Sequence, residues 1–165
     1  MPLGQENMKE EKMILLLDNF ITSDECKKVI QLHQKHSHLA RDWFGAYPID
    51  TSKLSSFLIN KILKRSEKTV QKYFNSKFTI DWAEVKLHRK GSRHPLHYDN
   101  ARPNTTLASV IYLNDITSGQ IIFKEGIQIT PKSGRIITYN GKEYLHGVNE
   151  CLEDRYTIPI WYKHL

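Results

Sequence analysis

The stretch LASVIYLNDITSGQIIF, residues 107–123, decides what kind of fold this chain can adopt. It opens with a mostly apolar and β-branched run, passes through the turn-forming pairs Asn114-Asp115 and Ser118-Gly119, and closes with a second apolar run. Such runs, separated by turn residues, are typical of neighbouring β-strands. The same pattern extends over the second half of the chain, where short strands are expected at residues 78–80, 84–88, 107–113, 120–123, 127–129, 135–139, 145–148 and 156–162.

Before residue 78 the pattern changes to helical periodicity. Thr22 and Glu25 form a capping box ahead of a helix expected at residues 23–36. Apolar residues at helical spacing indicate a second, longer helix over residues 54–74. Between the two helices, residues 38–50 are rich in aromatic side chains without a clear period, and they are expected to form a loop.

Many short strands after two helices predict an α+β, mostly β fold class. The expected architecture is an antiparallel sandwich or jelly roll with the N-terminal helices packed on one sheet. This architecture is often used to hold a ligand between its sheets.

Length and composition favour one globular domain. With 165 residues, of which 39% are hydrophobic, the chain can bury one core, and we expect a flexible N-terminal segment at residues 1–12 followed by a single domain at residues 13–165.

The longest apolar run, residues 13–17, is far shorter than the roughly 20 residues of a membrane span, so no membrane partner is expected. No signal-peptide pattern is present, which predicts a cytoplasmic protein. Cys26 and Cys151 are too few and too far apart for a disulfide framework, and we expect buried thiols.

The excess of positive charge lies in the middle of the chain. Residues 51–100 carry 11 basic and four acidic residues. A basic region of this kind can attract nucleic acid or an acidic substrate. The basic residues between 61 and 72 lie at helical spacing, however, so a solvated helix face is the favoured interpretation.

A small set of polar residues in the β-rich half indicates a metal site. In His97-Tyr98-Asp99, one intervening residue places both potential ligands on the same side of an extended segment. His146 lies in a separate predicted strand, and Arg155 follows it by nine residues. Two imidazoles and one carboxylate form the facial triad that suits Fe(II) and leaves open positions for a chelating cosubstrate. A buried arginine would bind the far carboxylate of a dicarboxylate such as 2-oxoglutarate.

Residues 81–161 resemble the catalytic core of the Fe(II)/2-oxoglutarate-dependent dioxygenases, and specifically the prolyl 4-hydroxylase-like branch. Five blocks carry this resemblance, in family order: His97-Tyr98-Asp99-Asn100, residues 110–115 with 119–123, residues 131–135, His146-Gly147-Val148, and residues 155–162. The resemblance implies a double-stranded β-helix, also called a jelly roll, as the core of the fold.

The resemblance also implies a role for each matching side chain. The implied iron ligands are His97, Asp99 and His146. Arg155 is implied to pair with the distal carboxylate of 2-oxoglutarate, with Tyr112 adding a hydroxyl, and His88 stands near the cosubstrate where relatives often have a tyrosine. The expected catalytic residues are therefore His97, Asp99, His146 and Arg155. The candidates on the substrate side are Trp161 and Asn100.

The implied function is that of an oxidoreductase. It would use Fe(II) and 2-oxoglutarate, with ascorbate as a candidate accessory cofactor, to hydroxylate proline in a peptide or protein and release succinate and CO2. The loops at residues 39–50 and 89–96 are expected to select the substrate.

Three other functions stay open. One is the same chemistry on a free amino acid or another small molecule. A second is action on nucleic acid, which the charge of residues 51–100 suggests, although a peptide or protein partner is the favoured expectation. The third is a non-catalytic jelly-roll module that binds the metal for structure.

Overall fold

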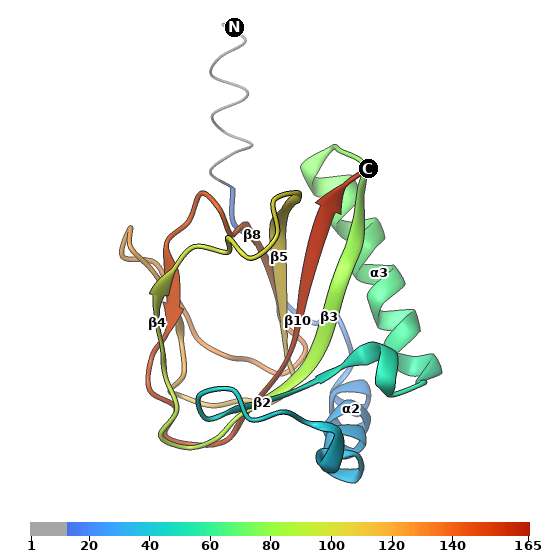
Figure 1. Cartoon of the computed structure of the whole chain (residues 1–165), viewed down its shortest axis with the longest axis vertical. Coiled ribbons are helices and arrows are strands. Elements are labelled where there is room, and N and C mark those ends of the chain that lie inside the picture. The colour runs from blue at the N-terminus through green and yellow to red at the C-terminus, as the bar shows by residue number, and fades with distance from the viewer. Residues whose placement is uncertain (1–12) are drawn as a thin grey trace, which may run out of the picture.

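The computed structural model describes residues 13–165 (Figure 1). The expected flexible segment at residues 1–12 lies outside the described residues. In chain order the elements are β1 (Leu15–Leu17), α2 (Ser23–Lys35), a 3-10 turn (Ser37–Leu39), β2 (Ala46–Asp50), a second 3-10 turn (Thr51–Lys53), α3 (Phe57–Phe74), β3 (Phe78–His88), β4 (His94–His97), β5 (Thr105–Tyr112), β6 (Ile121–Phe123), β7 (Gln128–Ile129), β8 (Ile136–Asn140), β9 (His146–Val148) and β10 (Arg155–His164).

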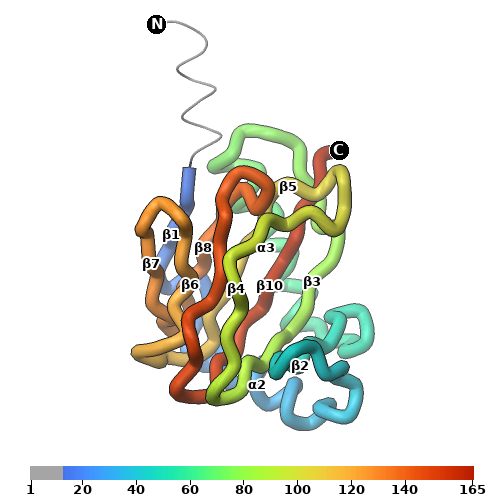
Figure 2. The backbone as a smooth tube through the Cα atoms, turned by 60° about the vertical axis from the view of Figure 1, so that its left-hand side comes forward, coloured from blue at the N-terminus to red at the C-terminus, as the bar shows by residue number. Residues whose placement is uncertain are grey.

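The strands form two antiparallel sheets. The larger sheet has six strands in the order β1-β8-β5-β10-β3-β2, and the smaller has four in the order β4-β9-β6-β7. Figure 2 shows the smaller sheet in front of β8 and β10, so that one face of each sheet is turned toward the other. The predicted antiparallel, mostly β fold with two helices is confirmed.

Both helices begin at side-chain caps. The predicted capping box is present, because the Glu25 N–H donates to the Thr22 hydroxyl at 3.1 Å and the Thr22 N–H donates to the Glu25 carboxylate at 3.0 Å. The helix α3 begins at Phe57, later than predicted, because a 3-10 turn precedes it and Ser56 supplies the cap. Both helices lie on the outer side of the larger sheet (Figure 1), as expected.

Alternation of side chains along the strands divides the interior into two cores. Ile158 and Ile160 of β10 face the helices and pack in one cluster with Ile62 of α3. Val110 of β5 belongs to a second cluster that includes Ile121 of the smaller sheet. The residues of the larger sheet between those that face the helices therefore point toward the smaller sheet and can reach a ligand between the two.

The prediction of a loop at residues 38–50 is wrong in part. Residues Ala46–Asp50 form β2, an edge strand that pairs with β3 alone. An edge strand tolerates Pro48 because only one side of its backbone is paired. The proline and the short alternation hid this strand from a pattern-based prediction.

Two further strands differ from the prediction. The two expected short strands at residues 78–80 and 84–88 are one continuous strand, β3, held over its whole length by β10. The strand β4, at His94–His97, was not expected, and it exists through its pairing with β9. Tertiary pairing decides both cases: β10 pairs with residues between the two predicted runs of β3, and β9 holds a segment that has no strong β pattern of its own.

Among the described residues, no helix has the length and apolar character needed to cross a membrane. Cys26 and Cys151 are both free and buried, as predicted.

Gly134 joins the first helix to the larger sheet. Its carbonyl accepts a hydrogen bond from the Phe20 N–H at 2.8 Å, and its own N–H donates to the Tyr112 carbonyl at 2.9 Å. Its φ is +85°, and a Cβ at this position would run into the carbonyl oxygen of Ile21. The junction therefore requires glycine, both for the left-handed backbone and for the close approach.

We expect Gly134→Ala to lower the free energy of unfolding by about 3 kcal/mol, since left-handed strain of about 1 kcal/mol is added to a backbone collision. Urea unfolding followed by tryptophan fluorescence measures the loss. Gly126→Ala is the matched control, because Gly126 has a φ of +93° with no atom within 4 Å of the added Cβ, and it should cost only about 1 kcal/mol. Equal losses in the two variants would contradict this account of the junction.

Candidate active site

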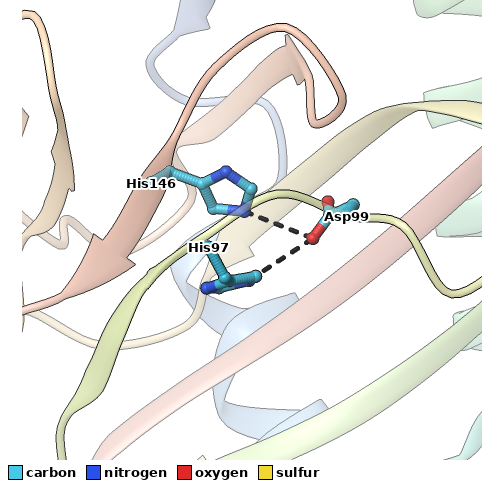
Figure 3. A group of neighbouring side chains, drawn as sticks. All are labelled: His97, Asp99 and His146. Atoms are coloured by element: carbon cyan, nitrogen blue, oxygen red, sulfur yellow. Dashed lines mark ion pairs between the residues drawn. The ribbon is translucent and has the colours of Figure 1, made fainter.

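The three predicted iron ligands come together where two strands pair. His97 is the last residue of β4, and its register partner is His146, the first residue of β9. Asp99 follows two residues later, and its backbone N–H donates to the Gly141 carbonyl at 2.8 Å. One ligand atom from each of the three side chains lies within 4.8 Å of the others. Figure 3 shows both imidazoles directed at the same Asp99 oxygen.

Backbone carbonyls orient both imidazole rings. Nδ1 of His97 lies 2.9 Å from the Pro95 carbonyl, and Nδ1 of His146 lies 2.7 Å from the Tyr144 carbonyl. A carbonyl only accepts, so each Nδ1 carries the proton and donates. The lone pair of each Nε2 is then directed toward Asp99 Oδ1, at 3.4 Å from His97 and 3.3 Å from His146. Three acceptors therefore face one point, where a cation stabilises them.

The electrostatics of the group agree with a cation at this point. Burial alone would raise the pKa of Asp99, but hydrogen bonds and charge from His146 and His97 outweigh burial and hold that pKa well below its usual range. Burial alone would lower the pKa of His97, yet Asp99 and the Pro95 carbonyl raise it. Without a metal the group therefore favours a proton on an imidazole, and a divalent ion would replace that proton.

A cavity of about 470 Å³ has these three residues in its wall. Both sheets contribute to it, for example through Val110 and Thr157 from the larger sheet and Ile121 and Val148 from the smaller one. Apolar and polar side chains both line the cavity, as in sites that bind small ligands.

Arg155 also lines this cavity and is only 2% exposed. It is the register partner of His88 on β3, and its guanidinium donates to His88 Nδ1 at 3.2 Å. Burial, together with the charges of Arg155 and Lys86, lowers the pKa of His88 well below its usual value. His88 is therefore neutral and acts as the acceptor that positions Arg155.

Two buried donors beside one another lack a partner. Among the described residues, neither Nε of Arg155 nor the hydroxyl of Tyr112 has a hydrogen-bond partner, although both atoms are buried. The Arg155 guanidinium carbon lies 5.3 Å from the centre of the Tyr112 ring. Buried donors are normally satisfied, so this pair is suited to an acceptor that enters from the cavity, such as a carboxylate.

The two predicted residues on the substrate side, Trp161 and Asn100, both line the cavity. The Trp161 ring stacks on Trp82, with ring centroids 4.3 Å apart. Asn100 follows Asp99 directly and is exposed. The structure therefore brings all eight predicted site residues to the cavity or directly behind it.

Sequence reasoning missed three polar or aromatic residues of the cavity wall on β3. Trp82, Glu84 and Lys86 line the cavity together with His88. A signal was available, because these four residues alternate along one strand and must share a face. Glu84, Lys86 and His88 already share a face within the expected strand at residues 84–88, and only Trp82 requires the longer strand.

The sequence profile of the 2OG-Fe(II) oxygenase superfamily matches residues 83–163, which include the three clustered residues and Arg155. The chain belongs to this superfamily. No curated protein matches this oxygenase in sequence.

Solved structures of several oxygenases have a similar fold. The viral collagen prolyl hydroxylase of Paramecium Bursaria Chlorella virus-1, in its 2OG complex, aligns with a TM-score of 0.75 and 19% identity over 93% of this chain and 97% of that one. A Pseudomonas putida prolyl-4-hydroxylase aligns with a TM-score of 0.79 and 13% identity over 93% and 94% of the two chains. The non-heme alpha ketoglutarate dependent epimerase SnoN from nogalamycin biosynthesis aligns with a TM-score of 0.79 and 14% identity over 99% and 84%.

The expected cofactors, Fe(II) and 2-oxoglutarate, are confirmed for this oxygenase. The residues present fit both groups. Two imidazoles and one carboxylate are a donor set that suits Fe(II). The unpaired donors of Arg155 and Tyr112 suit a carboxylate end of 2-oxoglutarate.

Gly141 holds Asp99 in place, a role that the sequence did not indicate. Its carbonyl accepts from the Asp99 N–H, and its own N–H donates to the Thr106 carbonyl at 2.8 Å. A Cβ at this position would lie 2.8 Å from Cγ of Asp99, closer than two carbons can approach. Any side chain here would therefore push the carboxylate away from the two imidazoles.

We expect Gly141→Ala to weaken metal binding by about tenfold to 100-fold, the usual cost of losing a group that orients a ligand. Isothermal titration with Mn(II), with circular dichroism to verify folding, measures the change. Gly126→Ala is again the matched control and should bind Mn(II) as the unmodified chain does. Unchanged affinity in Gly141→Ala would show that Asp99 does not depend on this contact.

Proposed function

We propose that this chain is a 2-oxoglutarate-dependent dioxygenase in which His97, Asp99 and His146 hold Fe(II) and Arg155 binds the distal carboxylate of 2-oxoglutarate. One observation carries the proposal: three ligand atoms converge in the wall of the same cavity that is lined by a buried arginine with an unpaired Nε. The metal and the dicarboxylate then have anchors in one enclosed space.

Each side chain has a defined task in this proposal. When bound, Fe(II) with 2-oxoglutarate and oxygen supplies the oxidation that yields succinate, CO2 and a hydroxylated substrate. The Pro95 and Tyr144 carbonyls keep the imidazole Nε2 atoms of His97 and His146 available as ligands. Tyr139 packs against the His146 ring at 4.8 Å and shields it from water.

The order of the strands supports a double-stranded β-helix within one domain at residues 13–165. From β3 to β6, successive strands alternate between the larger and the smaller sheet, and β8, β9 and β10 alternate again. This alternation wraps two antiparallel sheets around a shared interior.

The proposed substrate is proline in a peptide or protein. The viral collagen prolyl hydroxylase and the Pseudomonas putida prolyl-4-hydroxylase share the fold over nearly the whole chain. The stacked rings of Trp82 and Trp161 in the cavity wall offer a flat apolar surface on which a pyrrolidine ring can pack. A small-molecule substrate is the second candidate, because SnoN has the same fold with a TM-score of 0.79.

Anaerobic addition of Fe(II) and 2-oxoglutarate should produce the weak visible charge-transfer band of the metal with its cosubstrate. We expect His146→Ala to abolish the band, because one of the three ligands is lost. Arg155→Ala should raise the 2-oxoglutarate concentration needed for the band about 30-fold or more, since breaking a buried charge-assisted contact costs about 2–5 kcal/mol.

Two further variants make this titration specific. Arg155→Lys keeps the charge but not the paired donors, so its requirement for 2-oxoglutarate should lie between those of the alanine variant and the unmodified chain. Arg89→Ala removes an exposed arginine and should change nothing. Iron binding without any band would show that the chain uses the metal without 2-oxoglutarate.

With Fe(II), 2-oxoglutarate, ascorbate and oxygen, we expect proline-containing peptides to gain one oxygen atom and to yield hydroxyproline on hydrolysis. Mass spectrometry and amino-acid analysis measure the product, and peptides with alanine in place of proline are the control. Turnover of 2-oxoglutarate with no hydroxyproline from any peptide would exclude the proline substrate while leaving the dioxygenase chemistry intact.

A further inference from the structure

All three tryptophans of the chain line the one cavity that holds the candidate metal site. Trp82 and Trp161 stack on each other from paired positions of β3 and β10. Trp43 comes from the segment before β2, far from the others in sequence. The wall outside the metal site is therefore strongly aromatic, which favours an apolar group of the substrate.

Two cations lie against these rings. Arg102, which is 53% exposed, has its guanidinium carbon 4.3 Å from the centre of the Trp82 ring, and the buried cation beside the other two rings is Lys86. The ammonium of Lys86 is 5.2 Å from the centre of the Trp43 ring and 5.7 Å from the centre of the Trp161 ring. Its side chain is only 12% exposed. Lysine is seldom buried to this degree without a partner, so its position in a cavity wall requires an explanation.

The nearest carboxylate forms an ion pair with this lysine, but it is shared with a second cation. Oε1 of Glu84 accepts a hydrogen bond from Arg41 at 2.9 Å. The other oxygen, Oε2, lies 3.6 Å from the Lys86 ammonium, beyond hydrogen-bond distance, and has no hydrogen-bond partner among residues 13–165. Glu84 is thus shared between two cations and is already held by Arg41.

The charges that line the cavity leave a positive excess. Apart from the metal-site residues, the charged side chains in its wall are Arg41, Glu84, Lys86, Arg102 and Arg155. The proposed function assigns Arg155 to 2-oxoglutarate, and Arg102 pairs with Asp81 at 3.1 Å. Arg41, which is 62% exposed, and the buried Lys86 share the single carboxylate of Glu84, so one positive charge remains in excess beside Lys86.

We propose that Lys86 is the anchor for an anionic group of the substrate, a carboxylate or a phosphate, whose apolar part packs on Trp43 and Trp161. This inference rests on the proposed function and narrows its substrate to an acidic one. The proline would then be part of a molecule that carries a negative charge close to the reacting ring. Lys86 determines specificity, while the metal and Arg155 hold the two ends of 2-oxoglutarate.

Tryptophan fluorescence tests the proposal without knowledge of the natural substrate, because every tryptophan reports on this cavity. The sample is the full chain with Fe(II) and 2-oxoglutarate under anaerobic conditions, and the quenchers are iodide, caesium and neutral acrylamide at constant ionic strength. We expect iodide to quench more strongly than caesium. In Lys86→Gln the ratio of the two quenching constants should fall at least twofold, with acrylamide unchanged.

Small ligands then test the substrate class on the same samples. Cyclohexanecarboxylate should protect the tryptophans from iodide, and the uncharged cyclohexanecarboxamide should not. Cyclohexyl phosphate distinguishes a phosphate from a carboxylate, according to which of the two acids protects at lower concentration. Protection by the preferred acid should need at least tenfold more ligand in Lys86→Gln.

Control variants keep these outcomes distinguishable. Lys64→Gln removes an exposed lysine of α3 and should match the unmodified chain. Lys86→Gln leaves Oε2 of Glu84 without a cation beside it. The double variant Glu84→Gln/Lys86→Gln therefore tests the loss of Lys86 without this uncompensated carboxylate oxygen. An unchanged iodide-to-caesium ratio, or equal protection by the amide, overturns the proposal. If the charge-transfer band of Lys86→Gln needs as much 2-oxoglutarate as that of Arg155→Ala, Lys86 belongs to the cosubstrate site and the proposal is overturned too. If the unmodified chain shows no band at all, the proposed function is rejected instead.

Discussion

The antiparallel pairing of β3 with β10 is the constraint on which the rest of the structure depends. These two long strands lie next to each other in the larger sheet. On one face they carry apolar residues that the two helices cover. On the other face the register places Arg155 opposite His88 and Trp161 opposite Trp82. Side chains alternate along each strand on either side of a bulge at Trp161/Tyr162, so a shift of one residue would bury the polar set under the helices. The helix-side core therefore fixes the cavity wall.

The proposed metal site and the proposed cosubstrate anchor lie on different sheets. His97 and His146 are fixed by the pairing of β4 with β9, and Arg155 belongs to β10. The separation between them is therefore set by the packing of one sheet on the other. Phe123 and Tyr139, whose ring centroids are 5.1 Å apart, belong to the core between the sheets. A close-packed core of this kind resists deformation, which keeps two sites from different sheets at one distance.

The sequence predicted the parts of the site that have a spacing and missed those that depend on tertiary pairing. His97 with Asp99 and the later His146 and Arg155 were identifiable because they fall, in order, within blocks that resemble the dioxygenase core. These residue types also suit a metal and a dicarboxylate. The strands β2 and β4 were not, because Pro48 interrupts one and the other has no strong pattern. Splitting β3 into two short strands left Trp82 outside the face that Glu84, Lys86 and His88 share. Nothing in the sequence singled out Lys86, because its contact with Trp43 depends on the tertiary structure.

The unsatisfied groups of the structure gather around the cavity. The buried side-chain atoms without a hydrogen-bond partner among residues 13–165 are Glu84 Oε2, Ser92 Oγ, Tyr112 OH and Arg155 Nε. Glu84 and Arg155 line the cavity, and Tyr112 lies directly against Arg155. Each such group costs about 1–3 kcal/mol relative to a satisfied one, and a sequence selected for stability alone would have paired or replaced it. Their concentration at one place indicates that the free energy of unfolding is lower there than it could be, for the sake of binding. A ligand that satisfies these groups would raise the free energy of unfolding again.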